Sequence, residues 1–487
     1  MERFVGCKKN ICAEVKGYMS DSYVKKLQRG IVLVFIANLI NLIISLMNGF
    51  ILPKYLSVET YASIKTYQLY GNYIGVLALG YADGLYLKYG GMKMRGIPND
   101  EINICRTNLL IFQGIITIIF VSIGWCINDI ILMITSLTII PVNVAAAFKN
   151  ILQATGEFKV YSRIMNYSSV LTFVVTIILL FIVRTDYDLV YIGAMAAVTF
   201  LVWVLLEKKL KTVHNTTLKL KVSLRNLNEN IQAGIVLMLG NFSNILMTSI
   251  DRWFVKFLLP TANFAYYSFV VSTENLVGIF INPIVTTMYN YICVTTDYVA
   301  IRKIKRMCMI FALFLVSGAF PVKFILEIYL TKYLPSQYVL FILFSTEILF
   351  IMIKGIYVNI YKAEKRQDIY LKQLIIAVIL GCVFNIIFYM IFKSNEGIAF
   401  ATLLSVICWY IICCFSVKEV MPDLKEIVVL IISIPSFICT GFFLPSIMGF
   451  IVYVAIEMVL CMLFMRKDFM ALLQMMFSMI CKKISKK

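Results

Sequence analysis

Long apolar runs separated by alternately basic and nearly neutral gaps are the feature that most constrains this chain. Runs of about 20 apolar residues are long enough to cross a bilayer as helices. With the N-terminus placed in the cytosol, 36 of the 45 Lys and Arg lie in the tails and even-numbered gaps, whereas 8 lie in or beside the odd-numbered gaps. This asymmetry follows the positive-inside rule and predicts both the count and the orientation of the spans. The fourteen predicted spans are centred near Ile40, Leu77, Ile116, Ile140, Val174, Ala196, Leu239, Gly278, Leu313, Leu343, Leu380, Val406, Ile434 and Glu457.

The composition agrees with a membrane-embedded chain. Of 487 residues, 61% are hydrophobic and only 15% are charged, which leaves too few charged residues to cover soluble domains. We therefore predict an all-α polytopic membrane protein with both termini in the cytosol. The net charge of +19 comes from basic residues beside helix ends, which favours membrane lipids as partners and argues against nucleic acid.

Motifs for metal or nucleotide chemistry are absent from the sequence. The 13 cysteines include no CxxC pair, so neither a zinc site nor a disulfide framework is predicted. No glycine-rich loop followed by Lys and Ser or Thr is present, so no nucleotide cofactor is expected. The longest predicted external gaps, around Lys54–Thr66 and Lys323–Gln337, are too short for the outer domain of a membrane glycosyltransferase or polymerase. We therefore do not expect an enzyme.

An internal repeat predicts two similar halves. A shift of 203 positions aligns three asparagines of the first half with three of the second, and a shift of 209 aligns the ends of the fourth and tenth spans. Six spans per copy keep both copies in the same orientation, which predicts two pseudo-symmetric six-helix lobes around a central cavity, with two further C-terminal helices. The aligned pairs include Asn38 with Asn241, Asn41 with Asn244, Asn72 with Asn275, Tyr86 with Tyr289, Ala154 with Ala363, and Tyr161 with Tyr370.

The spans and the repeat together predict six segments. They are a cytosolic N-terminal segment (1–28), an N-lobe of spans 1–6 (29–206), a cytosolic linker (207–230), a C-lobe of spans 7–12 (231–416), spans 13 and 14 (417–465), and a basic cytosolic tail (466–487).

Polar groups inside the spans are the candidates for function. An Asp, Lys or Arg at the centre of a span costs about 2.5 to 3.5 kcal/mol on insertion, so such residues usually face a cavity or a partner. Glu347 and Lys354 are seven residues apart, which places both on one helical face. The predicted substrate-binding residues are Lys354, Arg252, Lys65, Asn41, Asn72, Asn244 and Asn275, and the predicted coupling or gating residues are Asp251, Glu274, Asp83 and Glu347.

Each candidate also has a purely structural interpretation. Asp251 with Arg252 could mark only the water boundary, Asp83 could pair with Lys88, and the asparagines could bond neighbouring helices. In the second span, the GxxxG pairs formed by Gly71, Gly75, Gly80 and Gly84 favour close helix packing rather than a site.

Two stretches, Phe50–Gly91 and Ser249–Phe269, resemble segments of Wzx-type polysaccharide-biosynthesis flippases of the multidrug/oligosaccharidyl-lipid/polysaccharide exporter superfamily. The matching points are Tyr61-Ala62, the element from Gly80 to Gly84, and Asp251-Arg252 followed by Tyr267. Gln153–Gly156 with Lys159 and Tyr161 also resembles the family's fourth-helix exit. Helix count, repeat and order match along the whole chain.

The resemblance implies an undecaprenyl-pyrophosphate-linked oligosaccharide as substrate, flipped across the bacterial inner membrane by alternating access. It implies a role in O-antigen, capsule or exopolysaccharide synthesis, with a polysaccharide polymerase and a chain-length regulator as candidate partners. Cationic ligands for the pyrophosphate would be Arg252, Lys256, Lys65 and Lys354. H⁺ or Na⁺ is left open as the coupling ion. The alternatives are a cation-coupled multidrug or metabolite exporter of the same superfamily and, third, a membrane glycosyltransferase or polymerase.

Overall fold

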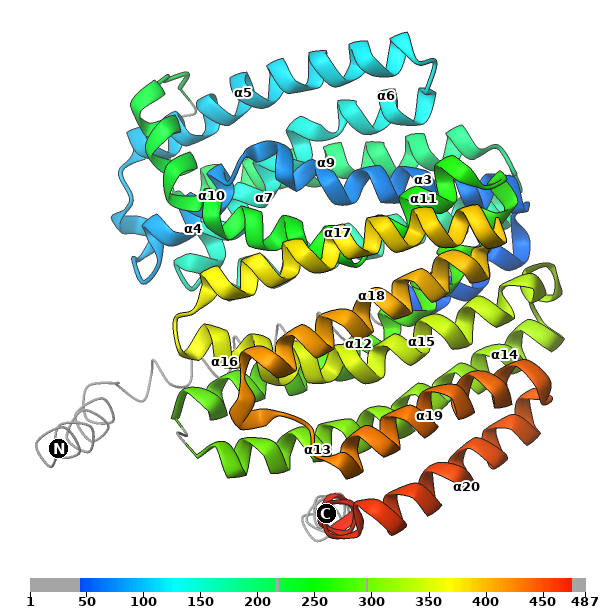
Figure 1. The fold of residues 1–487 in the computed structure, drawn as a ribbon. Coiled ribbons are helices and arrows are strands. Elements are labelled where there is room, and N and C mark those ends of the chain that lie inside the picture. The colour runs from blue at the N-terminus through cyan, green and yellow to red at the C-terminus, as the bar shows by residue number, and fades with distance from the viewer. Residues whose placement is uncertain (1–43, 215–218, 295–296, 475–487) are drawn as a thin grey trace, which may run out of the picture. The chain divides into compact units, whose positions relative to one another are not determined.

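The computed structural model describes residues 44–214, 219–294 and 297–474, and within these residues all regular structure is helical (Figure 1). Residues 44–55 are helical and precede the labelled elements. These are α3 (Val58–Ile74), η1 (Gly75–Ala78), α4 (Tyr81–Tyr89), η2 (Met94–Gly96), α5 (Asn99–Cys126), α6 (Ile130–Leu137), α7 (Ile139–Ala154), α8 (Phe158–Ile177), η3 (Ile178–Val183), α9 (Asp188–His214), α10 (Leu224–Met247), α11 (Ile250–Leu258), α12 (Thr261–Val294), α13 (Tyr298–Leu315), η4 (Val316–Gly318), α14 (Ala319–Ile328), η5 (Thr331–Ser336), α15 (Gln337–Met352), η6 (Ile353–Tyr357), α16 (Val358–Ala363), α17 (Gln367–Phe392), α18 (Asn395–Ser416), η7 (Lys418–Val420), α19 (Leu424–Phe443) and α20 (Ser446–Phe464).

The described residues contain 11 helices that are long and apolar enough to cross a membrane, and a shorter apolar helix at Tyr167–Val183. This confirms the predicted all-α multi-pass membrane protein. The centre of the first predicted span, Ile40, lies outside the described residues. The count of fourteen therefore stays a prediction.

The second predicted span is broken into two helices. α3 ends at Ile74, η1 follows, and Leu79 and Gly80 then adopt left-handed conformations with φ of 48° and 81° before α4 begins. Glycine adopts such a conformation without a steric cost, which explains why the break falls at Gly80. The pattern of apolar residues alone predicted one continuous helix here.

Within the external gap predicted around Lys54–Thr66, the chain has a short break at Leu56 and Ser57 between two helices, and the external position of this gap stays a prediction. α3 begins at Val58, because the Ser57 hydroxyl accepts the backbone N–H of Thr60 at 3.2 Å and so caps the first turn. The Asp186 side chain in turn accepts the backbone N–H of Ser57 at 3.0 Å. As a result, Lys65 is carried on a helix rather than on a loop.

The chain forms two compact units. The first contains Ile74–Thr185 and Leu189–Met238, and the second contains Leu46–Tyr73, Asp186–Asp188 and the described residues from Leu239 onward. The segment boundaries expected from the sequence stay a prediction.

In the first unit, α4 and α10 approach each other closely. A Cβ atom at Gly84 would lie 2.0 Å from the carbonyl oxygen of Asn230, and one at Gly234 would lie 2.1 Å from the carbonyl oxygen of Gly80. No such neighbour exists within 4 Å at Gly71 or Gly75. Of the two predicted GxxxG pairs, Gly80 and Gly84 therefore supply the close packing.

In the second unit, the span Thr331–Ala363 is central, with 89% of its apolar window buried. α15 in this span packs against α12, α13, α18 and α19. Its end, η6, is a π-helical turn. Such turns are rare and are frequent at functional sites.

Two helices that end 209 positions apart, one in each unit, end with the same backbone geometry. α7 and α16 end at Ala154 and Ala363, and the residues that follow, Thr155 and Glu364, have φ, ψ of −87°, 2° and −83°, 1°. The next residues, Gly156 and Lys365, are left-handed, with φ of 75° and 58°. Further along, the left-handed Arg184 and Lys393 are also 209 positions apart. Because local geometry recurs at one offset, it supports the internal duplication.

Candidate functional site

Asp251 is a buried carboxylate in the first turn of α11, within the second unit. One of its oxygens accepts the backbone N–H of Arg252 at 2.8 Å, and the other accepts the hydroxyl of Tyr267 at 2.6 Å. Its residue is only 5% exposed, and Tyr267 on α12 is fully buried. The side chain therefore does more than mark a water boundary, because its two oxygens join α11 to α12.

Glu274 on α12 and Glu347 on α15 meet in the same unit. Their carboxyl groups interact electrostatically with each other, and Lys354 interacts electrostatically with both. The hydroxyl of Thr346 donates to Glu274 at 3.3 Å, and Asp251 lies within electrostatic range of Glu274. The structure thus brings four predicted site residues into one cluster, which we call the acid–lysine cluster: Asp251, Glu274, Glu347 and Lys354.

Lys354 lies in the π-helical turn η6. Its Nζ is 4.3 Å from the centroid of the Phe350 ring, a distance at which the ring face attracts a cation. The turn leaves Lys354 partly buried while Ile353 and Gly355 are buried. Two carboxyl groups and an aromatic face thus lie near the amino group of Lys354 within an apolar helix.

Three further cations and several aromatic rings lie on α3 and α11. Lys65 interacts electrostatically with Arg252, and Lys256 donates to the hydroxyl of Thr66 at 3.3 Å. The Nε of Arg252 is buried and has no hydrogen-bond partner among the described residues. We call these cations, together with the rings beside them, the cation–aromatic group: Lys65, Arg252, Lys256, Tyr70, Tyr73, Trp253 and Phe257.

The rings of this group are stacked. Trp253 stacks on Tyr70 with centroids 5.5 Å apart and on Phe257 with centroids 5.4 Å apart, and Tyr73 meets Trp253 edge-on at 5.5 Å. The Nζ of Lys256 lies 5.3 Å from the Tyr70 centroid. Aromatic faces next to cations offer both a stacking surface and positive charge. The sequence predicted the cations but not the rings, because aromatic residues are common in apolar spans.

The predicted asparagines are only partly described. Asn41 lies outside the described residues, and Asn72, Asn244 and Asn275 are exposed in the second unit. Their place in a cavity stays a prediction.

Asp83 belongs to the first unit. It is partly buried on α4. Lys88 pairs with Glu101 at 3.4 Å, so the structural interpretation in which Asp83 pairs with Lys88 was wrong. The physical reason is that Glu101 starts α5 and accepts from both Lys88 and Tyr89, at 3.4 and 2.8 Å.

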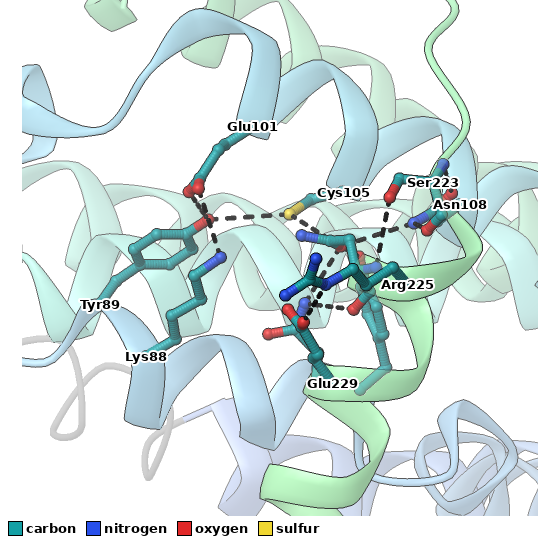
Figure 2. Close-up of polar contacts among 11 residues, drawn as sticks. Lys88, Tyr89, Glu101, Cys105, Asn108, Ser223, Arg225 and Glu229 are labelled. Carbon is teal, nitrogen blue, oxygen red and sulfur yellow. Dashed lines mark hydrogen bonds and ion pairs between the residues drawn. The ribbon is translucent and has the colours of Figure 1, made fainter.

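A polar network in the first unit connects α4, α5 and α10 (Figure 2). The Tyr89 hydroxyl bridges Glu101 and the thiol of Cys105, and the Tyr81 hydroxyl donates to Asn226 at 2.8 Å. The Asn108 side chain donates to the carbonyl of Ser223 at 2.8 Å. The sequence did not predict this network, since its members are single polar residues far apart along the chain.

The network fixes residues 219–223, which we call the strap, along α5. The backbone N–H groups of Lys219, Lys221 and Ser223 donate to the side chains of Asn103, Thr107 and Asn108 at 3.2, 3.2 and 3.1 Å. Alternate residues of an extended segment point to one side, and Asn103 and Thr107 are four residues apart on one face of α5, with Asn108 next to Thr107. The end of the expected cytosolic linker is therefore bound to a helix.

Comparisons with known proteins identify the fold. No protein-family profile matches the sequence, and a search of curated proteins finds no match. The solved structure of the lipid II flippase MurJ, in an inward closed conformation, is similar with a TM-score of 0.66 and 15% identity, over 90% of this chain and 99% of that chain. An inward-facing multidrug resistance MATE family transporter of the MOP superfamily is similar with a TM-score of 0.55 and 13% identity, and the match covers 79% of this chain and 95% of that chain. The chain therefore has the fold of MOP-superfamily transporters.

Proposed function

We propose that this protein is a flippase that moves undecaprenyl-pyrophosphate-linked oligosaccharides across the bacterial inner membrane by alternating access. The observation that carries the proposal is the cation–aromatic group in the second unit. A pyrophosphate needs cationic hydrogen-bond donors, which Lys65, Arg252 and Lys256 supply. Sugar rings have apolar faces that can stack on Trp253 and Tyr70. The similar structure whose name is lipid II flippase supports a lipid-linked substrate.

The acid–lysine cluster suits energy coupling. Glu274 and Glu347 together carry more negative charge than Lys354 can balance, so uptake and release of a proton by this pair would change the net charge of the cluster. We propose H⁺ rather than Na⁺ as the coupling ion, because Lys354 already neutralises negative charge there. Cytosolic termini and partnership with a polysaccharide polymerase and a chain-length regulator belong to the same proposal.

The second candidate is a cation-coupled multidrug or metabolite exporter. The observation that favours it is the number of intramembrane carboxylates in the second unit, together with the similarity to a multidrug transporter. The cation–aromatic group distinguishes the two candidates. Its three cations attract a pyrophosphate but repel a cationic drug.

The test is complementation of a flippase-null strain at matched protein levels. Lys354→Ala should insert normally but abolish export of surface polysaccharide, because the carboxyl pair loses its counter-charge. Lys354→Arg should keep part of the export, since it preserves charge with a different donor geometry. Lys362→Ala, an exposed lysine at the end of the same span, is the matched control and should export normally. Full export by Lys354→Ala would remove Lys354 from the site, and failure of the wild-type gene to restore polysaccharide while conferring drug resistance would favour the exporter.

A further inference from the structure

A charged cleft of about 560 Å³ lies in the second unit, where α19 begins and α20 ends. It is separate from the acid–lysine cluster and the cation–aromatic group, with which it shares no lining residue. Its charged lining residues are Arg306, Asp423, Lys425, Arg466, Lys467 and Asp468.

The two carboxylates of the cleft are already paired with one of its cations. Arg306 on α13 lies 2.9 Å from Asp423 and 3.5 Å from Asp468, and it also pairs with the buried Glu426 at 2.9 Å. Four cations and two carboxylates line the cleft, so its charged residues have a net charge of +2, which favours an anionic ligand.

Three cations of the cleft remain open. Lys425, Arg466 and Lys467 are exposed, and no ion pair joins them to any other residue that the structure describes. Lys425 is in the first turn of α19, and Arg466 and Lys467 follow the end of α20. Both helices are long and apolar enough to cross a membrane, so three cations without ion pairs at their ends are expected where a membrane meets water.

One side of the cleft is apolar, and a stacked aromatic pair lies next to it. Phe469 is buried and stacks on Phe314 of α13 with centroids 5.8 Å apart, which holds the chain after α20 in place. Leu424 and Leu463 line the cleft and are 76% and 71% exposed. Exposed leucines beside unpaired cations match a molecule with an anionic head and a hydrocarbon body.

We propose that this cleft binds an anionic diacyl phospholipid of the inner leaflet. Its phosphodiester contacts Lys425, Arg466 and Lys467, and its acyl chains lie along Leu424 and Leu463. Basic pockets between helices at the cytosolic side of a membrane attract anionic lipid headgroups, and a charge-assisted hydrogen bond to phosphate is stronger than a neutral one. The lipid would anchor the last two spans independently of the transported substrate.

The experiment is native mass spectrometry of the full-length protein in detergent, titrated with phosphatidylglycerol. The variant is the triple substitution Lys425→Gln, Arg466→Gln, Lys467→Gln. The matched control carries Lys303→Gln, Lys362→Gln and Lys372→Gln, which remove the same charge from exposed positions outside the cleft. The cleft variant should bind phosphatidylglycerol about tenfold more weakly, and the control should bind as the parent does. A thermal melt of both proteins checks that each is folded.

Competition against bound phosphatidylglycerol tests whether the cleft recognises a phospholipid or a free phosphate ion. Neither millimolar inorganic phosphate nor zwitterionic phosphatidylcholine should displace the bound lipid if both the charge and the acyl chains are recognised. Equal binding by the cleft variant and the parent would overturn the proposal. Displacement by inorganic phosphate would overturn it in favour of a soluble-anion site, and preferential binding of undecaprenyl pyrophosphate would overturn it in favour of the transported lipid.

Discussion

The hydroxyl of Tyr267 on α12 donates a hydrogen bond to Asp251 on α11 at 2.6 Å, and both residues are buried. A carboxylate removed from water needs such donors, because leaving one unmade costs more than the bond itself contributes. Asp251 has two donors, the other being the backbone N–H of Arg252. The tyrosine hydroxyl is therefore the one donor that a side-chain substitution can remove.

We predict that Tyr267→Phe lowers the free energy of unfolding by about 1–3 kcal/mol, because it leaves one oxygen of Asp251 buried without its donor. Asp251→Asn should lower it less, since an amide oxygen still accepts from Tyr267. In a double-mutant cycle measured by thermal melting in detergent, the two effects should be non-additive. Tyr266→Phe, on the adjacent and less buried tyrosine, is the control. Additive losses would show that the two side chains do not act together.

The sequence predicted the charged members of the site because intramembrane charges are rare and costly. Asp251, Glu274, Glu347 and Lys354 could be found in this way. Thr346 and Trp253 could not, since a hydroxyl or an indole carries no comparable insertion cost and its role depends on contacts between helices. The pairing of Lys88 with Glu101 was missed for the same reason, because it depends on how α4 meets α5.

At the scale of helices, the contact between α4 and α10 depends on residues without side chains. We predict that Gly84→Leu destabilises the protein by more than the about 1–3 kcal/mol typical of overpacking, because its Cβ would meet the backbone of Asn230 rather than a flexible side chain. Gly75→Leu, with open space around it, is the matched control and should retain near-wild-type stability.

The measurement for this pair is the fraction of monodisperse protein after solubilisation and its melting temperature. Similar values for Gly84→Leu and the wild type would mean that α4 and α10 separate in the membrane. The control also matters because both glycines belong to predicted GxxxG pairs, and only the structure distinguishes them.

Helix continuity was less predictable than helix existence. Apolar periodicity predicted the second span but not its break at Leu79 and Gly80, since a left-handed pair has no hydropathy signature. Within the predicted outer gap at Lys54–Thr66 the chain breaks at Leu56 and Ser57, and the Ser57 cap allows α3 to begin at Val58.

For the whole molecule, the unequal distribution of Lys and Arg between alternate gaps predicts which gaps face the cytosol. In a cysteine-free background, Leu220→Cys in the strap, where the leucine is 79% exposed, should react with a membrane-impermeant maleimide only after the membrane is permeabilised. Lys332→Cys, predicted to be external, should react in intact cells. Labelling of Leu220→Cys from outside would contradict the predicted orientation of every span.

Much of the fold was predictable because it depends on two features that are easily seen in a sequence, the length of the apolar runs and the offset of the internal repeat. Run length separates membrane helices from other segments, and a duplicated chain repeats its features at a fixed offset. The helix endings at Ala154 and Ala363 were predicted as equivalent from two identities, and their backbone angles agree. What the offset could not predict was the composition of the two compact units, in which Leu46–Tyr73 belongs with the later part of the chain.

The offset itself records how the two halves diverged after duplication. It is 203 at Tyr289 but 209 at Glu364, so the second half is six residues longer than the first between those points. Glu347 and Lys354 fall inside this stretch. At the 209 offset their counterparts are Thr138 and Ala145, which carry no charge. At this offset the charge pair therefore belongs to the second half alone, so the two halves of the repeat are not chemically equivalent.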